Sequence, residues 1–172
     1  MTGAQTNHEL AVDSIYTALV QLMEKKPYKE ITITDITKRA GVSRMAYYRN
    51  YETKDEILTK RLEGEIHNLS ERSKRKKYTS MEDALVDFFD TFQADGILQT
   101  VVRAGLVDKL IDYHKSLMIE LYKNILDVDL SIPENMMRLF ADMGSAVGMI
   151  LYCKEQDFKV DSKIIAQMLT NH

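Results

Sequence analysis

The sequence holds few of the residues that interrupt helices or cross-link chains. It has two prolines, seven glycines and one cysteine in 172 residues. So few helix breakers, together with many Leu, Ile, Met, Glu and Lys, favour long helices over a sandwich or barrel. A lone cysteine, Cys153, excludes an internal disulfide framework and a metal site built on paired thiols. We therefore expect an all-α protein suited to a reducing compartment.

Long apolar runs are also missing. The longest weakly polar run, 143–153, is shorter than the roughly 20 residues that a helix needs to span a bilayer. Glu9 and Asp13 interrupt the start of the chain, where a signal peptide needs an apolar stretch. Apolar residues make up 45% and charged residues 28%, which is the balance of a globular protein. The sequence predicts a cytoplasmic protein without a membrane partner.

Patterns of catalytic and metal sites are absent from the sequence. The four histidines lie far apart without paired ligand spacing, at positions 8, 67, 114 and 172. We find no glycine-rich phosphate loop, no Gly-x-Ser-x-Gly elbow and no carboxylate pair that stands out from surface charge. Cys153 follows an apolar helix face, which favours an inert core thiol. We expect no catalysis, no metal and no cofactor.

Charge is divided unevenly along the chain. Residues 1–78 hold 15 basic against 11 acidic side chains, and residues 79–172 hold 8 against 15, giving +4 and −7 within a net charge of −3. Residues 25–54 alone hold 8 basic against 3 acidic side chains. A basic front and an acidic back indicate that only the front meets a polyanion such as double-stranded DNA.

Helix starts are marked by pairs of Ser or Thr with an acidic residue three positions later. The pairs are Thr6 and Glu9, Thr32 and Asp35, Thr53 and Glu56, Ser80 and Asp83, and Ser131 and Glu134. Apolar spacing extends these starts into helices, with Gly41 and Gly96 as stops, and predicts a long helix over 106–126. The polar run 72–77 is either a boundary that contacts DNA or a solvated helix end. We divide the chain into 1–54, 55–78 and 79–172.

Two short predicted helices around a tight turn have the spacing of a helix-turn-helix. The bracing helix covers Thr32–Ala40, Gly41 and Val42 form the turn, and the recognition helix covers Ser43–Tyr48. That second helix offers a cation for guanine or phosphate and two phenols for phosphate oxygens. The side chains expected to be exposed on it are Arg44, Met45, Tyr47 and Tyr48.

The segment Ile31–Leu58, ITITDITKRAGVSRMAYYRNYETKDEIL, resembles the TetR family of bacterial transcription regulators. The likeness rests on the Ala-Gly-Val-Ser turn, on Tyr48 with Tyr51, and on Lys54, and it extends over about residues 8–60. Tyr51 is interpreted as a core anchor. The resemblance implies phosphate contacts for Thr32, Ser43, Tyr48 and Lys54, and a place facing the major groove for Arg44, Met45 and Tyr47.

The resemblance also implies an architecture, an N-terminal three-helix helix-turn-helix domain followed by a C-terminal helical regulatory and dimerisation domain. The last two helices, Pro133–Lys154 and Asp161–Leu169, would form a four-helix interface in a homodimer. Two recognition helices about 34 Å apart could then read a palindrome. Small residues allow close helix approach either there or within one subunit, namely Gly144, Ser145, Ala146 and Gly148.

In proteins of this type, a small-molecule effector binds among the central helices of the C-terminal domain. Polarisable and aromatic residues that could line such a pocket are Phe88, Phe92, Tyr113, His114, Met118, Met143 and Tyr152. At helical spacing, stripes of aromatic and Met residues more often form a packed core.

We expect a ligand-responsive repressor that acts as a homodimer on a palindromic operator. The alternative is an architectural or cell-cycle factor that binds DNA without an effector. A third reading, a protein-interaction dimer that has lost its DNA contacts, is disfavoured by the intact Arg44, Tyr48 and Lys54.

Overall fold

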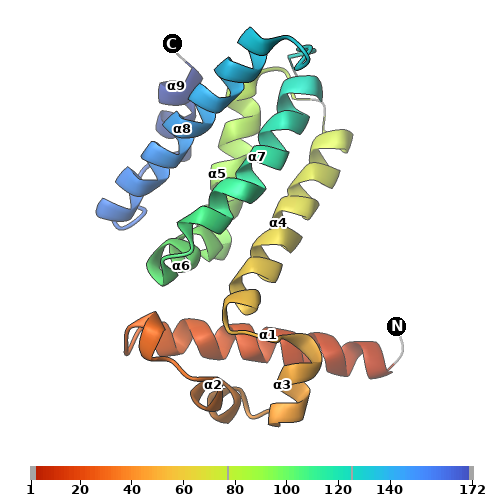
Figure 1. Cartoon of the computed structure of the whole chain (residues 1–172), viewed down its shortest axis with the longest axis vertical. Coiled ribbons are helices and arrows are strands. Elements are labelled where there is room, and N and C mark those ends of the chain that lie inside the picture. The colour runs from red at the N-terminus through yellow and green to blue at the C-terminus, as the bar shows by residue number, and fades with distance from the viewer. Residues whose placement is uncertain (1–2, 77, 125, 171–172) are drawn as a thin grey trace. The chain divides into compact units, whose positions relative to one another are not determined.

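The computed structural model describes residues 3–76, 78–124 and 126–170. Every regular element in these ranges is helical (Figure 1), so the predicted all-α class is confirmed. The elements are α1 (Gly3–Met23), η1 (Tyr28–Glu30), α2 (Ile33–Ala40), α3 (Arg44–Asn50), α4 (Asp55–Arg75), α5 (Met81–Asp95), α6 (Ile97–Ala104), α7 (Val107–Asn124), α8 (Pro133–Glu155) and α9 (Ser162–Thr170).

The chain forms two compact units. The first unit extends to Arg61 and includes residues 103–105, and the second comprises 62–102 and the chain from Leu106 onward. The division between them falls inside α4, a 21-residue helix that runs to Arg75. The basic run that begins at Arg72 is therefore the last turn of α4 as far as Arg75, while Lys77 lies outside the described residues.

In the first unit, α1 packs against α2 and α3 around a small apolar core. Ile15 and Leu19 of α1, Ile36 of α2 and Tyr47 of α3 are fully buried, as is Ile57 at the start of α4. Residues 15 and 19 are one turn apart on α1, so a single face of that helix supplies its share of the core.

In the second unit, α5 packs against α9 and α7 packs against α8. Phe88, Phe89 and Phe92 of α5 form an aromatic cluster, with centroids 5.1 Å apart for Phe88 and Phe89 and 4.5 Å apart for Phe88 and Phe92. Leu139, Met143, Ala146, Ile150 and Cys153 follow one buried face of α8 at intervals of three or four residues. This spacing is the one expected for a helix with one side against a core.

The structure differs from the prediction at one helix start, at one helix cap and in one additional helix. The helix expected to begin at Thr6 already runs from Gly3, so Thr6 does not cap it. The helix expected at Pro133–Lys154 runs over Pro133–Glu155, but its N-cap is Ile132, which makes no side-chain bond, and not the expected Ser131. The helix α6 was not expected, because its eight residues lie between Gly96 and Gly105, both of which have positive φ and end helices.

Candidate nucleic-acid interface

The N-terminus of α2 is closed by a reciprocal cap. The Thr32 hydroxyl accepts a hydrogen bond from the Asp35 amide at 3.1 Å, and the Asp35 carboxylate accepts one from the Thr32 amide at 2.9 Å. The Lys26 ammonium lies 2.7 Å from the same carboxylate. The Lys26 hydrogen bond and those from Thr32 hold the pKa of Asp35 well below its usual range. Thr32 is therefore fixed at the exposed end of the bracing helix, as its capping role requires.

The turn between α2 and α3 uses a left-handed residue. Gly41 has φ +69°, a conformation that favours glycine, and its amide donates to the carbonyl of Thr37. The amide of Val42 donates to the same carbonyl at 3.1 Å. Ser43 then caps α3, since its hydroxyl oxygen accepts a bond from the Ala46 amide at 3.0 Å. Ser43 is exposed, so its hydroxyl group could also donate to a phosphate oxygen.

The exposure predicted for Tyr47 is wrong. Its side chain is completely buried, whereas Met45 is 76% and Tyr48 is 48% exposed. Adjacent residues on a helix point about 100° apart, and on α3 the side that carries Tyr47 faces the core while the side that carries Tyr48 is exposed. The Tyr47 ring lies 5.8 Å from that of Tyr51, which is 5% exposed and has the core position expected for it.

The hydroxyl of Tyr47 has no hydrogen-bond partner within the described part of the chain. Burial raises the pKa of this phenol far above its ordinary value. Tyr47 therefore cannot reach a base or phosphate from this position, and its ring instead supports Tyr48 edge-on, with centroids 5.4 Å apart.

Arg44, at the start of α3, is held in place by two partners. One guanidinium nitrogen donates to the Tyr48 hydroxyl at 3.2 Å, and the other approaches the Thr34 hydroxyl at 3.4 Å. The guanidinium carbon lies 5.8 Å from the centre of the Tyr48 ring. Sequence reasoning missed Thr34, although its place two residues after the cap Thr32 puts it on the same exposed helix end.

Lys54 lies just before α4, and its ammonium is occupied by the main chain. The ammonium donates to the carbonyls of Tyr28 at 2.7 Å, Ile31 at 2.9 Å and Lys29 at 3.3 Å. It also lies 4.5 Å from the centre of the Tyr28 ring. An ammonium has three protons, so these acceptors engage all of them. The phosphate contact expected for Lys54 stays a prediction, and it would require one of these bonds to be given up.

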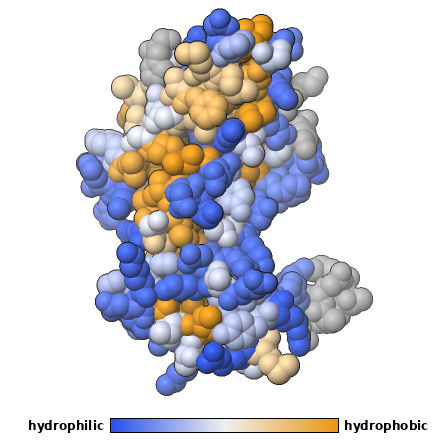
Figure 2. All heavy atoms as spheres, in the orientation of Figure 1, coloured by the Kyte–Doolittle hydropathy of each residue, from blue (hydrophilic) through white to orange (hydrophobic). Residues whose placement is uncertain are grey.

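Further cations are exposed on the first unit. Lys29, Lys38, Arg39 and Arg49 are all exposed, and the Arg39 guanidinium donates to Gln21 of α1 at 2.8 Å. Together with Arg44, they give the surface that carries α2 and α3 the positive charge predicted from residues 25–54. The visible side of this unit is mainly hydrophilic (Figure 2).

The residues expected to line an effector pocket lie mainly in the packed core of the second unit. Five of the seven are at most 4% exposed, namely Phe88, Phe92, His114, Met118 and Met143. Tyr113 is half-buried and Tyr152 is 50% exposed. These side chains follow helical spacing because they fill the space between helices, so the core interpretation of the five is correct.

His114 stands out within that core. It is 2% exposed, and neither ring nitrogen has a hydrogen-bond partner among the described residues. The nearest aromatic neighbour is Phe88, whose centroid lies 5.8 Å away. Desolvation lowers the pKa of His114 to about 4, so the imidazole is neutral in the folded protein at neutral pH.

Sequence reasoning also missed a cavity of about 420 Å³ in the second unit. It lies where α5 begins, α7 ends, α8 begins and α9 ends. Its apolar lining includes Leu126, Val128 and Leu169. Its polar lining includes Tyr122, whose hydroxyl donates to Asp142, and Arg138. A cavity of this volume falls in the range of small-molecule sites.

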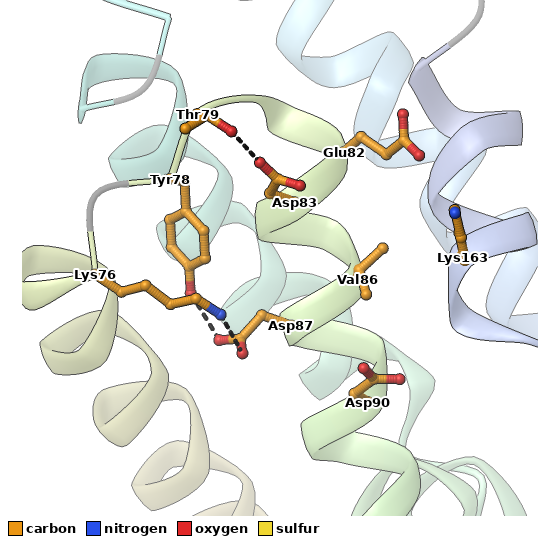
Figure 3. Close-up of a pocket in the computed structure, with 9 residues that line it drawn as sticks. All are labelled: Lys76, Tyr78, Thr79, Glu82, Asp83, Val86, Asp87, Asp90 and Lys163. Atoms are coloured by element: carbon orange, nitrogen blue, oxygen red, sulfur yellow. Dashed lines mark hydrogen bonds and ion pairs between the residues drawn. The ribbon is translucent and has the colours of Figure 1, made fainter.

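A second cavity, of about 350 Å³, is bordered by four carboxylates of α5 and by Lys76 and Lys163 (Figure 3). Asp87 accepts hydrogen bonds from Tyr78 at 2.7 Å and from Lys76 at 3.1 Å. The hydroxyl of Ser162 donates to Asp90. These bonds tie the end of α4 and the start of α9 to α5, so the cluster has a structural use.

The outer face of α8 and α9 carries exposed apolar side chains. On α8 these include Met137 (72% exposed), Phe140 (49%) and Leu151 (42%), and on α9 they are Ile164 (56%) and Met168 (58%). Patches of hydrophobic residues are visible on this unit in Figure 2. By length and composition alone, α8 is apolar enough to cross a membrane, in contrast to the expectation from 143–153, and 28% of its apolar window is buried inside the protein. One such helix is weak evidence for a membrane span.

Comparisons with known proteins support the helix-turn-helix of the first unit and the fold of the chain. Residues 15–60 match the family model of bacterial regulatory proteins of the TetR family. A crystal structure of a TetR transcriptional regulator from Streptococcus agalactiae 2603V is 20% identical, with a TM-score of 0.66, over 96% of this chain and 94% of that chain. No curated protein sequence matches. These findings support a DNA-binding transcription regulator with a TetR-like fold and a TetR-type helix-turn-helix.

Proposed function

We propose that the protein is a cytoplasmic repressor that binds a palindromic operator as a homodimer and is released by a small molecule. The observation that carries the DNA-binding part is the restrained Arg44 beside exposed Met45 and Tyr48 on a capped, basic helix-turn-helix. Thr32 and Ser43 lie at exposed helix N-termini, where hydroxyl and amide groups can contact phosphates. Repression would follow because the bound protein occludes polymerase.

The exposed face of α8 and α9 supports dimerisation. One exposed side of α8 carries, at intervals of three or four residues, Met137, Phe140, Gly144, Gly148 and Leu151. A Cβ at either glycine would meet no heavy atom within 4 Å in the described part of the chain, so packing within one subunit does not require glycine there. Ala146 is 2% exposed and belongs to the inner face instead. A second copy would cover this stripe and explain both its apolar character and its small residues.

A gel-shift titration on duplexes selected from a random library tests DNA binding through α3. Arg44→Ala and Tyr48→Ala should each weaken binding by about 10-fold or more, because each loses a phosphate or base contact. The control is Lys159→Ala, which also removes one positive charge. Its side chain is 81% exposed and lies in the second unit. Variants of Arg44 and Tyr48 that bind as tightly as wild type would contradict the proposal.

Analytical ultracentrifugation tests the dimer. Gly148→Glu should shift the protein toward monomer, because it puts a long charged side chain in the middle of the apolar stripe. Ile111→Glu changes a 39% exposed apolar residue on α7 and should leave the dimer intact. A wild-type protein that is monomeric at micromolar concentration would contradict the proposed homodimer and, with it, the palindromic operator.

Small-molecule control is proposed for the cavity at Tyr122, Arg138 and Asp142, because it offers both apolar walls and polar groups. An operator-driven reporter screened with small molecules should show release, and Leu169→Trp should abolish it by filling the cavity. A compound that releases the wild type and Leu169→Trp from DNA equally would act outside this cavity.

The packed environment of the five buried residues favours a second candidate, an architectural DNA-binding factor without an effector. Genome-wide occupancy separates the two, since a repressor binds few promoters and an architectural factor binds many scattered sites.

A further inference from the structure

We propose that each operator half-site presents a guanine to Arg44 and, at a neighbouring base pair, a thymine methyl group to Met45. The inference rests on the proposed binding of DNA through α3 and names the bases that this helix selects. It follows from the chemistry of two adjacent side chains and from the groups that restrain one of them.

Arg44 has the fork geometry that reads guanine, and the structure restrains its direction. The Tyr48 hydroxyl at 3.2 Å and the Thr34 hydroxyl at 3.4 Å engage one N–H on each terminal nitrogen, out of five N–H groups in all. The remaining donors are available to the guanine O6 and N7 atoms, the usual bidentate partners of arginine in the major groove. A side chain already held by two groups loses less conformational entropy on binding than a free one.

Met45 points to a different base. It is 76% exposed, the highest value among the exposed large hydrophobic residues of the described chain, and it lies on a basic surface. The major groove displays one apolar group, the C5 methyl of thymine. Contact with that methyl would remove apolar surface of Met45 from water, which is favourable.

The two bases must lie close together. Arg44 and Met45 are consecutive residues in the first turn of α3, separated by about 1.5 Å along the helix axis. The first turn of a recognition helix is the part that contacts base edges. Thr34, on α2, acts as a positioning residue in this scheme, because it touches Arg44 and need not touch DNA.

The experiment selects duplexes from a random library with the full-length wild-type protein and then replaces single atoms of the selected site. Changing the guanine to 7-deazaguanine removes the N7 acceptor and keeps O6, so it should weaken binding by part of the roughly 5- to 150-fold range of a full bidentate contact. Changing the thymine to deoxyuridine, which lacks only the methyl, should weaken it about 4-fold.

The variants assign each effect to its side chain. Met45→Ala should bind thymine and deoxyuridine sites equally, and Arg44→Lys should bind guanine and 7-deazaguanine sites with a much smaller difference, because it keeps the charge but loses the fork. Thr34→Val should weaken the preference for guanine and leave affinity for random-sequence DNA unchanged, and Thr34→Ser should restore the preference.

The outcomes distinguish failure of this base assignment from failure of the proposed DNA binding on which it rests. A wild-type protein that selects no sequence overturns both. A protein that selects a clear motif yet shows the same deoxyuridine and 7-deazaguanine effects in the wild type and in the Met45 and Arg44 variants overturns the base assignment alone. Circular dichroism of each variant confirms that losses do not come from unfolding.

Discussion

The first unit relies on side chains that bond to the main chain at helix ends, whereas the second relies on apolar side chains between long helices. In the first, Thr32, Ser43 and Lys54 tie short elements together through amides and carbonyls. In the second, the phenylalanines of α5 and the inner face of α8 fill the interior. Short helices bury little surface and need fixed ends, while long helices gain enough from packing to tolerate a plain cap such as Ile132.

The strongest test of this contrast is a large-to-small change in the second unit. Phe92 is completely buried. Phe92→Ala should lower the free energy of unfolding by about 4 kcal/mol, because it removes apolar contact and leaves a cavity. Urea denaturation measures it, with Ile111→Ala, at an exposed position of α7, as the control that should change by less than about 1 kcal/mol. Equal losses in the free energy of unfolding for Phe92→Ala and Ile111→Ala would show that the stability of this unit does not depend on its buried side chains.

The second prediction concerns pH and His114. Its pKa is about 4 in the folded protein, against an ordinary value of 6.5, so the neutral form is favoured by folding. Stability from this group is fully present above about pH 6.5 and is lost as the pH falls toward 4, by about 3 kcal/mol in total.

The matched variant for this test is His114→Leu. Over that pH range its free energy of unfolding should change less than that of the wild type, because it lacks the titrating imidazole. It should also be more stable at pH 7, since leucine leaves no buried nitrogen without a partner. Parallel curves for the wild type and the variant would show that His114 is not neutral and buried in solution.

In the first unit, loss of the Lys54 bonds should matter more than loss of an exposed charge. Lys54→Met should destabilise the protein by about 2 kcal/mol, because three carbonyls lose a charged donor. Lys38→Met removes the same charge from an exposed position and should have little effect on stability. If both variants weaken DNA binding to the same degree while only Lys54→Met unfolds more easily, the phosphate contact and the structural role of Lys54 coexist.

The smallest expected effect distinguishes the two adjacent tyrosines of α3. Tyr47→Phe should be neutral or stabilising by up to about 1 kcal/mol, because it removes a buried hydroxyl without a partner in the described chain. DNA affinity should not change. Tyr48→Phe should leave stability unchanged and weaken DNA binding, since its exposed hydroxyl also holds Arg44. The opposite pattern would restore Tyr47 to the DNA-binding surface.

Local chemistry explains which features could be predicted from the sequence. The caps at Thr32, Ser43 and Ser80 involve residues three positions apart, so the sequence contains both partners. The burial of Tyr47 depends on how a seven-residue helix is rotated against α1, and so short a helix has too few apolar positions to define that rotation.

Two other features depended on contacts distant in sequence. Lys54 bonds to residues more than twenty positions earlier, which no local pattern reveals. The cavity beside Arg138 arises where the ends of four helices meet, α5, α7, α8 and α9, whereas the sequence pointed to aromatic residues that fill the core. An apolar side chain at helical spacing has the same appearance in a sequence whether it lines a cavity or closes one.

The alternation of Tyr47 and Tyr48 has a consequence for how the target of the protein can evolve. On α3, residues that maintain the fold and residues that face outward are neighbours, and the exposed Tyr48 also packs edge-on against the buried Tyr47. Arg44 and Met45 are exposed, so changes at these two positions leave the interior untouched, and duplicated copies of the gene can acquire new operators without first losing a foldable product. The stability of the scaffold therefore makes new DNA specificities accessible one substitution at a time.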